Sequence, residues 1–179
     1  MSILKTRRSI RKYLAQDVSN ETIEKIISET ILAPSGHNTQ PWKFIIVRDE
    51  EIKRKIVAAD NNQTWMLEAP VFIVCLADAS VRFADISQID FRADSPDFVF
   101  KQLIRDCSIG ITYLLLASEQ NGLGACWTGW YNHDEMKKIL NIPNYMYVNG
   151  IVTLGYADEK PDSRPRLKLE EVLIANQIK

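Results

Sequence analysis

The sequence has few residues of the types that build metal sites, disulfide frameworks or membrane spans. Only three cysteines and two histidines occur among 179 residues, and no two cysteines have the CxxC spacing, so no metal site is expected. An odd number of cysteines (Cys75, Cys107 and Cys126) in apolar surroundings is typical of buried, reduced thiols. The longest apolar runs, such as residues 70–77, are too short to span a bilayer, and no signal-peptide core opens the chain. We therefore expect a cytoplasmic protein without a membrane partner.

The chain also lacks an excess of charge of either sign. The formal net charge is −1, whereas a general nucleic-acid binder carries a strong basic excess, so no nucleic-acid partner is expected. Hydrophobic residues make up 46% and charged residues 25% of the chain, as in ordinary globular proteins. No repeat, low-complexity tract or linker divides the sequence. Residues 1–179 are therefore predicted to form a single domain with one core.

Hydrophobic periodicity predicts an α+β fold with several helices around a small sheet. The isoleucines of residues 20–33 have helical spacing, and Pro34 disfavours a longer helix. The continuous apolar run 71–76 indicates a strand that is buried on both faces. Helices are predicted over 1–12, 20–33, 50–59, 99–120, 132 or 134–142, and 167–174; strands over 42–47, 71–76 and 147–154; a strand and turn over 124–130; and residues 78–96 as irregular or partly helical.

Two short basic clusters lie near opposite ends of the chain. Their members are Arg7, Arg8, Ser9 and Arg11 at the head, and Arg164 and Arg166 at the tail. Each cluster taken alone is more simply explained as a solvated helix end or a surface loop. Folding that brings both around one anion would explain their joint occurrence, because a phosphate dianion needs several charge-assisted donors. The clusters thus favour a cofactor that carries a phosphate.

Two loops rich in small residues could approach a flat ligand. Residues 34–42 join a helix to a strand, and an ordinary connecting turn explains them about as well as a ligand contact does. Residues 122–130 follow a helix and enter a strand, so their glycines do not form a dinucleotide fingerprint. His37 and His133 are predicted to be solvated loop histidines, and no nucleophile accompanies them. This absence favours a cofactor that supplies its own chemistry.

Taken in order, four segments resemble the nitroreductase family of FMN-dependent oxidoreductases. They are residues 7–11 (RRSIR), 33–42 (APSGHNTQPW), 122–129 (GLGACWTG), and 154–157 (LGYA) followed by a basic tail. The resemblance spans essentially the whole chain. It implies a small, mostly antiparallel central sheet surrounded by helices, in an intertwined homodimer that binds two FMN molecules at the subunit interface.

The resemblance also implies roles for individual residues. Arg7, Arg8, Ser9 and Arg11 would hold the phosphate, ribityl chain and pyrimidine edge of FMN, and Arg164 and Arg166 would join them at the phosphate. Pro34, Ser35, Gly36 and Asn38 would come from the other subunit and pack on the isoalloxazine. Thr128 and Gly129 would lie beside the flavin N5, and Asn62 and Gln63 are candidates for a further pyrimidine contact.

The implied activity is that of an FMN-dependent oxidoreductase. It would hold FMN tightly, use NADH or NADPH as a transient co-substrate, and reduce nitroaromatics, quinones or related small-molecule acceptors by a ping-pong mechanism. Hydride transfer requires no acid or base from the protein, so no catalytic residue is predicted. Two alternatives remain open at this point: a flavin-binding reservoir without turnover, and a specialised family member such as a reductive dehalogenase or a flavin-destroying enzyme.

Overall fold

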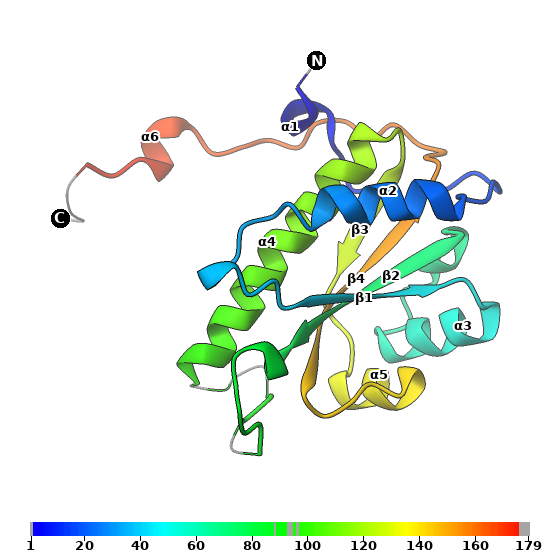
Figure 1. The fold of residues 1–179 in the computed structure, drawn as a ribbon. Coiled ribbons are helices and arrows are strands. Elements are labelled where there is room, and N and C mark those ends of the chain that lie inside the picture. Colours follow the sequence, from blue (N-terminus) through cyan, green and yellow to red (C-terminus); the bar gives the residue numbers. More distant parts are fainter. Residues whose placement is uncertain (1, 88, 93–94, 96, 176–179) are drawn as a thin grey trace.

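A four-stranded antiparallel sheet forms the centre of the computed structural model, which describes residues 2–87, 89–92, 95 and 97–175. The strands are β1 (Trp42–Val47), β2 (Val71–Asp78), β3 (Gly124–Thr128) and β4 (Met146–Gly155), in the spatial order β1-β2-β4-β3. Helices α2 (Asn20–Thr30) and α4 (Phe98–Gln120) cover one face of the sheet, and α3 (Glu50–Ala59) and α5 (His133–Leu140) cover the other (Figure 1). The predicted α+β class with an antiparallel sheet is confirmed.

Strand β2 lies in the middle of the fold, and all eight of its residues are buried. Val71 and Ile73 pack with α2 and α4, whereas the alternate residues Phe72 and Val74 pack with α3 and α5. Successive strand residues point to opposite faces, so a strand covered by helices on both faces has to be apolar throughout. The prediction from the apolar run 71–76 is confirmed, and the strand extends two residues further.

Side-chain caps set the starts of the long helices. Ser19, Asp49, Asp97 and Asn132 each accept a hydrogen bond from a backbone amide in the first turn of the helix that follows. Such caps satisfy amides that have no partner within the helix. The helices expected over 20–33, 50–59 and 99–120 are confirmed, and Asn132 rather than Asp134 precedes α5.

The head of the chain differs from its predicted helix over 1–12. Helix α1 covers only Ile3–Thr6, and its Leu4 side chain is 75% exposed. Ile10 is buried as expected, but from an extended segment. That segment pairs with β3 and with the chain after β4, through bridges from Ser9 to Ala125 and from Tyr13 to Ala157. Tertiary pairing therefore replaces the helix that local periodicity favoured.

The tail also differs from its predicted helix over 167–174. Helix α6 is a single turn, Leu169–Val172. The tail leaves the body of the molecule in Figure 1, and its apolar side chains are exposed. They are Leu167, Leu169, Val172, Leu173 and Ile174. An amphipathic helix needs a surface to pack against, and the described part of this chain offers none at that position.

Two smaller expectations can also be compared with the structure. Of residues 124–130, which were predicted to form a strand and a turn, β3 covers Gly124–Thr128. In the stretch 78–96, a 3-10 turn, η3 (Ala79–Val81), follows β2, and the prediction at residues 88, 93–94 and 96 lies outside the described residues. Among the residues described, no helix has the length and apolar character needed to cross a membrane.

Candidate functional site

Backbone pairing brings the head of the chain beside its tail. The amide of Ile10 donates to the carbonyl of Ala125 on β3 (3.1 Å), and the amide of Leu14 donates to the carbonyl of Tyr156 (2.9 Å). The carboxylate of Glu159 then accepts hydrogen bonds from the amides of Arg11 and Lys12. The head therefore runs along the segment that leaves β4, which fixes residues 7–11 next to residues 159–166.

The Tyr13 side chain fastens the head to the sheet. Its hydroxyl donates to the carbonyl of Ile10 (2.6 Å) and lies 2.7 Å from the hydroxyl of Thr153 on β4. The ring is 7% exposed, and burial raises the pKa of the phenol well above its usual value. Gly155 allows this close packing, because a Cβ there would lie 2.8 Å from the Tyr13 ring.

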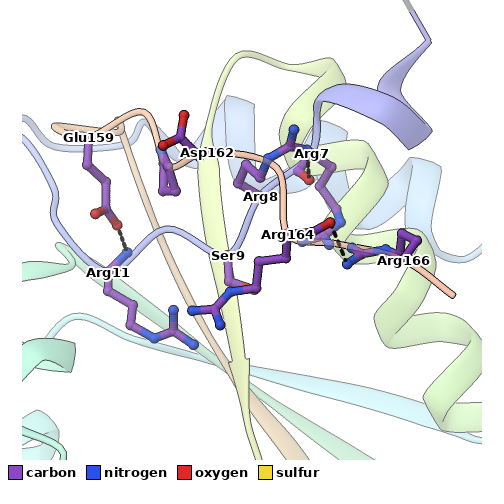
Figure 2. Close-up of a pocket in the computed structure, with 9 residues that line it drawn as sticks. Arg7, Arg8, Ser9, Arg11, Glu159, Asp162, Arg164 and Arg166 are labelled. Atoms are coloured by element: carbon purple, nitrogen blue, oxygen red, sulfur yellow. Dashed lines mark hydrogen bonds between the residues drawn. The ribbon is translucent and has the colours of Figure 1, made fainter.

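Head and tail arginines line one pocket of about 280 Å³. Its lining residues are Arg7, Arg8, Ser9, Arg11, Glu159, Pro161, Asp162, Arg164 and Arg166. Figure 2 shows the side chains of Arg11 and Arg164 reaching toward each other beside Ser9. The structure therefore brings together all six residues of the two predicted basic clusters. Five arginines against two carboxylates make the pocket strongly cationic, and its donors suit a phosphate.

The arginines of the pocket differ in how their hydrogen bonds are used. Arg8 donates from one nitrogen to the carbonyls of Lys5 (2.8 Å), Thr6 (3.1 Å) and Arg7 (2.9 Å), the last carbonyls of α1. Arg166 donates to two carbonyls of its own loop. Within the described chain, the guanidinium groups of Arg7, Arg11 and Arg164 form no hydrogen bond or ion pair. These three remain available to an anion.

Thr128 belongs to a series of hydrogen bonds that begins at buried Asp60 and leads through partly buried side chains toward Arg11. Its hydroxyl donates to a carboxylate oxygen of Asp60 (2.8 Å) and accepts from the amide of Gln63 (2.8 Å). Gln63 in turn accepts from the indole of Trp65 (3.2 Å). The Arg11 guanidinium lies 5.4 Å from the centre of the Trp65 ring, within cation–π range. Asn62 and Gln63 were the candidates for a further contact with the flavin pyrimidine. Gln63 takes part in these hydrogen bonds, and Asn62 is exposed.

Residues 34–40 lie apart from the arginine pocket in a single copy of the chain. None of Pro34, Ser35, Gly36 and Asn38 lines that pocket. A 3-10 turn, η1 (Gly36–Asn38), forms here, and Gly36 contacts Arg82 and Asp106 instead. One chain therefore does not unite the predicted loop with the predicted phosphate residues. The resemblance assigned this loop to a second subunit.

Gly129 lines a separate cavity of about 400 Å³ beyond Thr128. The other lining residues are Ile104, Ser108, Trp127, Tyr131, His133, Tyr147 and Asn149. His133 was predicted to be a solvated loop residue, which is wrong: it begins α5 and stacks on Tyr147 with ring centres 4.4 Å apart. Burial, followed by the nearby charge of Lys137, lowers the pKa of His133 to about 4. Its imidazole is therefore neutral at pH 7.

The three cysteines are buried and free, as the sequence indicated. Burial raises the pKa of the Cys107 thiol to about 12 and raises the pKa of Cys75 further. Cys126 lies near Arg11, Ser9 and Arg7 of the arginine pocket. Burial raises the pKa of its thiol, although Arg11, a hydrogen bond with Ser9, and Arg7 act in the opposite direction. Protonated, buried thiols are poor nucleophiles.

Sequence reasoning missed the residues that support the site from behind. Glu159, Asp60 and Trp65 fix the arginine pocket and Thr128 through the contacts described above. Asp106 was missed as well, although a carboxylate within the apolar helix predicted over 99–120 was a signal that could have found it. Arg82 lies in the stretch 78–96, which was predicted to be irregular or partly helical. Its contacts depend wholly on tertiary structure.

Comparison with known proteins adds a family match across most of the chain. The model described as the Nitroreductase family matches residues 4–156. A protein of Methanothermobacter thermautotrophicus, provisionally named an NADH dehydrogenase/NAD(P)H nitroreductase, is 33% identical over 168 residues, which cover 92% of this chain and 80% of that protein. FMN reductase (NAD(P)H) of Bacillus subtilis is 31% identical, covering 94% of this chain and 70% of that protein.

A solved structure shares the fold. B. megaterium NfrA2 superposes with a TM-score of 0.86 at 26% identity, covering 99% of this chain and 74% of that one. The similarity therefore includes the head, the sheet and both layers of helices, and it extends over almost the whole length described above.

Proposed function

Because the chain belongs to the nitroreductase family, we propose that it is an FMN-dependent oxidoreductase that takes electrons from NADH or NADPH. We propose nitroaromatics, quinones and related small molecules as its electron acceptors. The observation that carries the proposal is the joining of head and tail arginines around one pocket. The name of the B. subtilis relative, an FMN reductase that uses NAD(P)H, supports the same pair of cofactor and co-substrate.

The residues of the pocket fit the phosphate end of FMN. Arg7, Arg11 and Arg164 present guanidinium donors that no acceptor in the described chain engages, and like charges so close together are stabilised by an anion. Ser9 adds a hydroxyl at the floor of the pocket. Arg11 lines this pocket and also contacts Trp65, which is linked to Thr128 through Gln63. It is therefore the cation best placed to contact the flavin ring.

Each group of residues then has a part in the proposed activity. When bound, FMN would supply the redox chemistry, accepting hydride from the nicotinamide and passing electrons to the acceptor in ping-pong turnover. Arg7 and Arg164 would neutralise the phosphate, and Arg11 would stabilise negative charge on the pyrimidine side. Asp60 and Gln63 would orient Thr128 and, through it, the backbone of Gly129 beside the flavin N5. No side chain is assigned the role of proton donor.

We propose that the working unit is a homodimer in which the loop of residues 34–40 completes the flavin site of the partner. Two features support a second copy. The apolar tail side chains are exposed, and a groove of about 600 Å³ lies beside edge strand β1, where Ile27, Trp42 and Phe44 are among its lining residues. Unpaired strand edges and large apolar patches are typical of interaction surfaces.

Anaerobic reduction tests the proposed function. The purified protein should be yellow, NADH or NADPH should bleach its flavin without oxygen, and a nitroaromatic or a quinone should restore the colour. A colourless protein that takes up no added FMN would contradict the proposal. Tight FMN binding without oxidation of either nicotinamide would favour a reservoir, and preference for a halogenated tyrosine over all nitro compounds would favour a dehalogenase.

A further inference from the structure

We propose that Arg82 and Asp106 are positioning residues that hold the loop of residues 34–40 in the shape it presents to the flavin. This inference rests on the proposed function, because only a loop that meets the cofactor needs to be held for it. Neither residue lies in the arginine pocket. Their effect on the site would pass through the loop.

Arg82 connects the loop to α4 through one guanidinium group. One of its nitrogens donates to the carboxylate of Asp106, to the carbonyl of Gly36 (3.1 Å) and to the hydroxyl of Thr39 (2.9 Å), and its Nε donates to the same hydroxyl (3.1 Å). From the other side, the amide of Gly36 donates to the Asp106 carboxylate (3.1 Å). Both charges therefore engage the backbone of the same residue.

The ion pair is well shielded from solvent. The side chains of Arg82 and Asp106 are 8% and 12% exposed, whereas those of the surface pair Arg48–Asp17 are 32% and 76% exposed. A shielded pair is a weak source of net stability, because its desolvation offsets its attraction. Its fixed geometry is better suited to specifying a conformation.

The loop has a shape that needs such support. His37, Asn38 and Gln40 have φ values of 53°, 54° and 47°, in the left-handed region that side chains other than glycine adopt rarely. Three such residues within four positions make the loop unfavourable by itself, and residues of this kind persist where their surroundings hold them. Arg82 and Asp106 together form a clamp on this loop. Gly36 packs closely against the clamp, because a Cβ there would lie 2.8 Å from the Arg82 guanidinium.

The test replaces the planar fork while keeping the charge, in Arg82→Lys. Lysine can still pair with Asp106, but its side chain is shorter and carries one nitrogen, so it cannot also supply the separate hydrogen bond that the Nε of Arg82 donates to Thr39. We measure backbone amide exchange over residues 35–40 in the full chain, with and without FMN. The amides of Asn38 and Thr39, which donate to Ser35 (2.9 Å) and Gly36 (3.2 Å), should exchange about tenfold faster in the variant, since local opening becomes easier.

Two further measurements connect the loop to the cofactor. In the protein with bound FMN, the visible circular dichroism of the flavin should change in Arg82→Lys. The KM for the acceptor should rise about ten- to a hundredfold, as small displacements of a site can cause, whereas kcat should stay within about twofold. Asp106→Asn should reproduce these changes, because the clamp needs both partners.

A matched control uses the Arg48 clamp at the start of α2. Arg48 donates to Asp17, to the carbonyl of Val18 and to Asn20 (3.1 Å), so Arg48→Lys removes a comparable fork away from the loop. It should leave exchange over residues 35–40, the flavin spectrum and KM unchanged. If Arg82→Lys behaves like this control while the wild type binds FMN and turns over, the clamp is refuted and the proposed function stands. A wild type that binds no FMN overturns the proposed function and the role of the loop together.

Discussion

The hydrogen bonds that each arginine already makes determine which of them can bind an anion. Arg8 and Arg166 use their donors on backbone carbonyls, so they shape the arginine pocket more than they serve a ligand. Arg7 and Arg164, one from each end of the chain, have no such partner among the described residues. Two arginines can bind one phosphate only when both lie beside it, and the pairing of residues 10–14 with the sheet and tail brings Arg7 and Arg164 to one pocket.

We expect Arg7→Ala and Arg164→Ala each to weaken FMN binding about ten- to a hundredfold. Loss of a charge-assisted hydrogen bond costs about 1.5–3 kcal/mol, which corresponds to that range of affinity. Flavin fluorescence titration of the apoprotein measures the dissociation constant. Arg54→Ala, which removes an exposed arginine from α3, should leave it unchanged. Equal affinities in all three variants would show that the phosphate lies elsewhere.

At the scale of elements, the sequence prediction is accurate where capping residues and periodicity within the element determine its structure. Helices α2, α3 and α4 begin at capping residues and keep one periodicity throughout, so their positions could be read from the sequence. The segments 1–12 and 167–174 also have helical patterns, but their conformation depends on distant partners. The head pairs with Ala125 and Tyr156, and no local pattern encodes such pairing.

The candidate site divides in the same way. Arginines and glycines at characteristic spacings identified its members, whereas their supports, such as Glu159 and Asp60, could not be predicted because each acts through a residue far away in sequence. The environment of His133 was missed for that reason. Its ring packs on Tyr147, which belongs to β4.

Helix α5 should lose stability as the pH falls, because its first residue is a histidine held neutral. Burial lowers the pKa of His133 to about 4, below the value of about 6.5 expected in the unfolded chain. The resulting stability is present above pH 6.5 and is lost as the pH falls toward 4. Allowing for partial exposure, we expect this histidine to account for about 1 kcal/mol of the loss between pH 7 and pH 5.

Urea unfolding at the two pH values measures this loss. His133→Gln, which stays neutral, should reduce the difference between pH 7 and pH 5. His37→Asn should not, since His37 is exposed. A His133→Gln protein with the full wild-type pH dependence would place the responsible groups elsewhere.

At the scale of the whole molecule, the exposed tail supports the proposed homodimer. The side chains of Leu167, Leu169, Val172, Leu173 and Ile174 are 57–70% exposed. In a single copy, these large apolar side chains remain in contact with water. Their burial in a complex would lower the free energy. The loop of residues 34–40 lies apart from the arginine pocket in one chain, which supports the same proposal.

Light scattering should give a mass of twice the chain mass of 20.5 kDa. Deletion of residues 167–179 should shift the protein toward the monomer and weaken FMN retention at least about tenfold, because apolar burial between copies is lost. Deletion of residues 176–179 alone keeps the five apolar side chains and should preserve the dimer. A full-length monomer that holds FMN and turns over would contradict the proposed homodimer.

The meeting of the two chain ends also sets the time at which the pocket can form during synthesis. One part of its lining comes from residues 7–11, and another part comes from residues 159–166, which are synthesised much later. The sheet can assemble earlier around β2, since domains begin to fold as they emerge. Residues 159–166 therefore have to be synthesised before the pocket that they form with residues 7–11 can bind an anion.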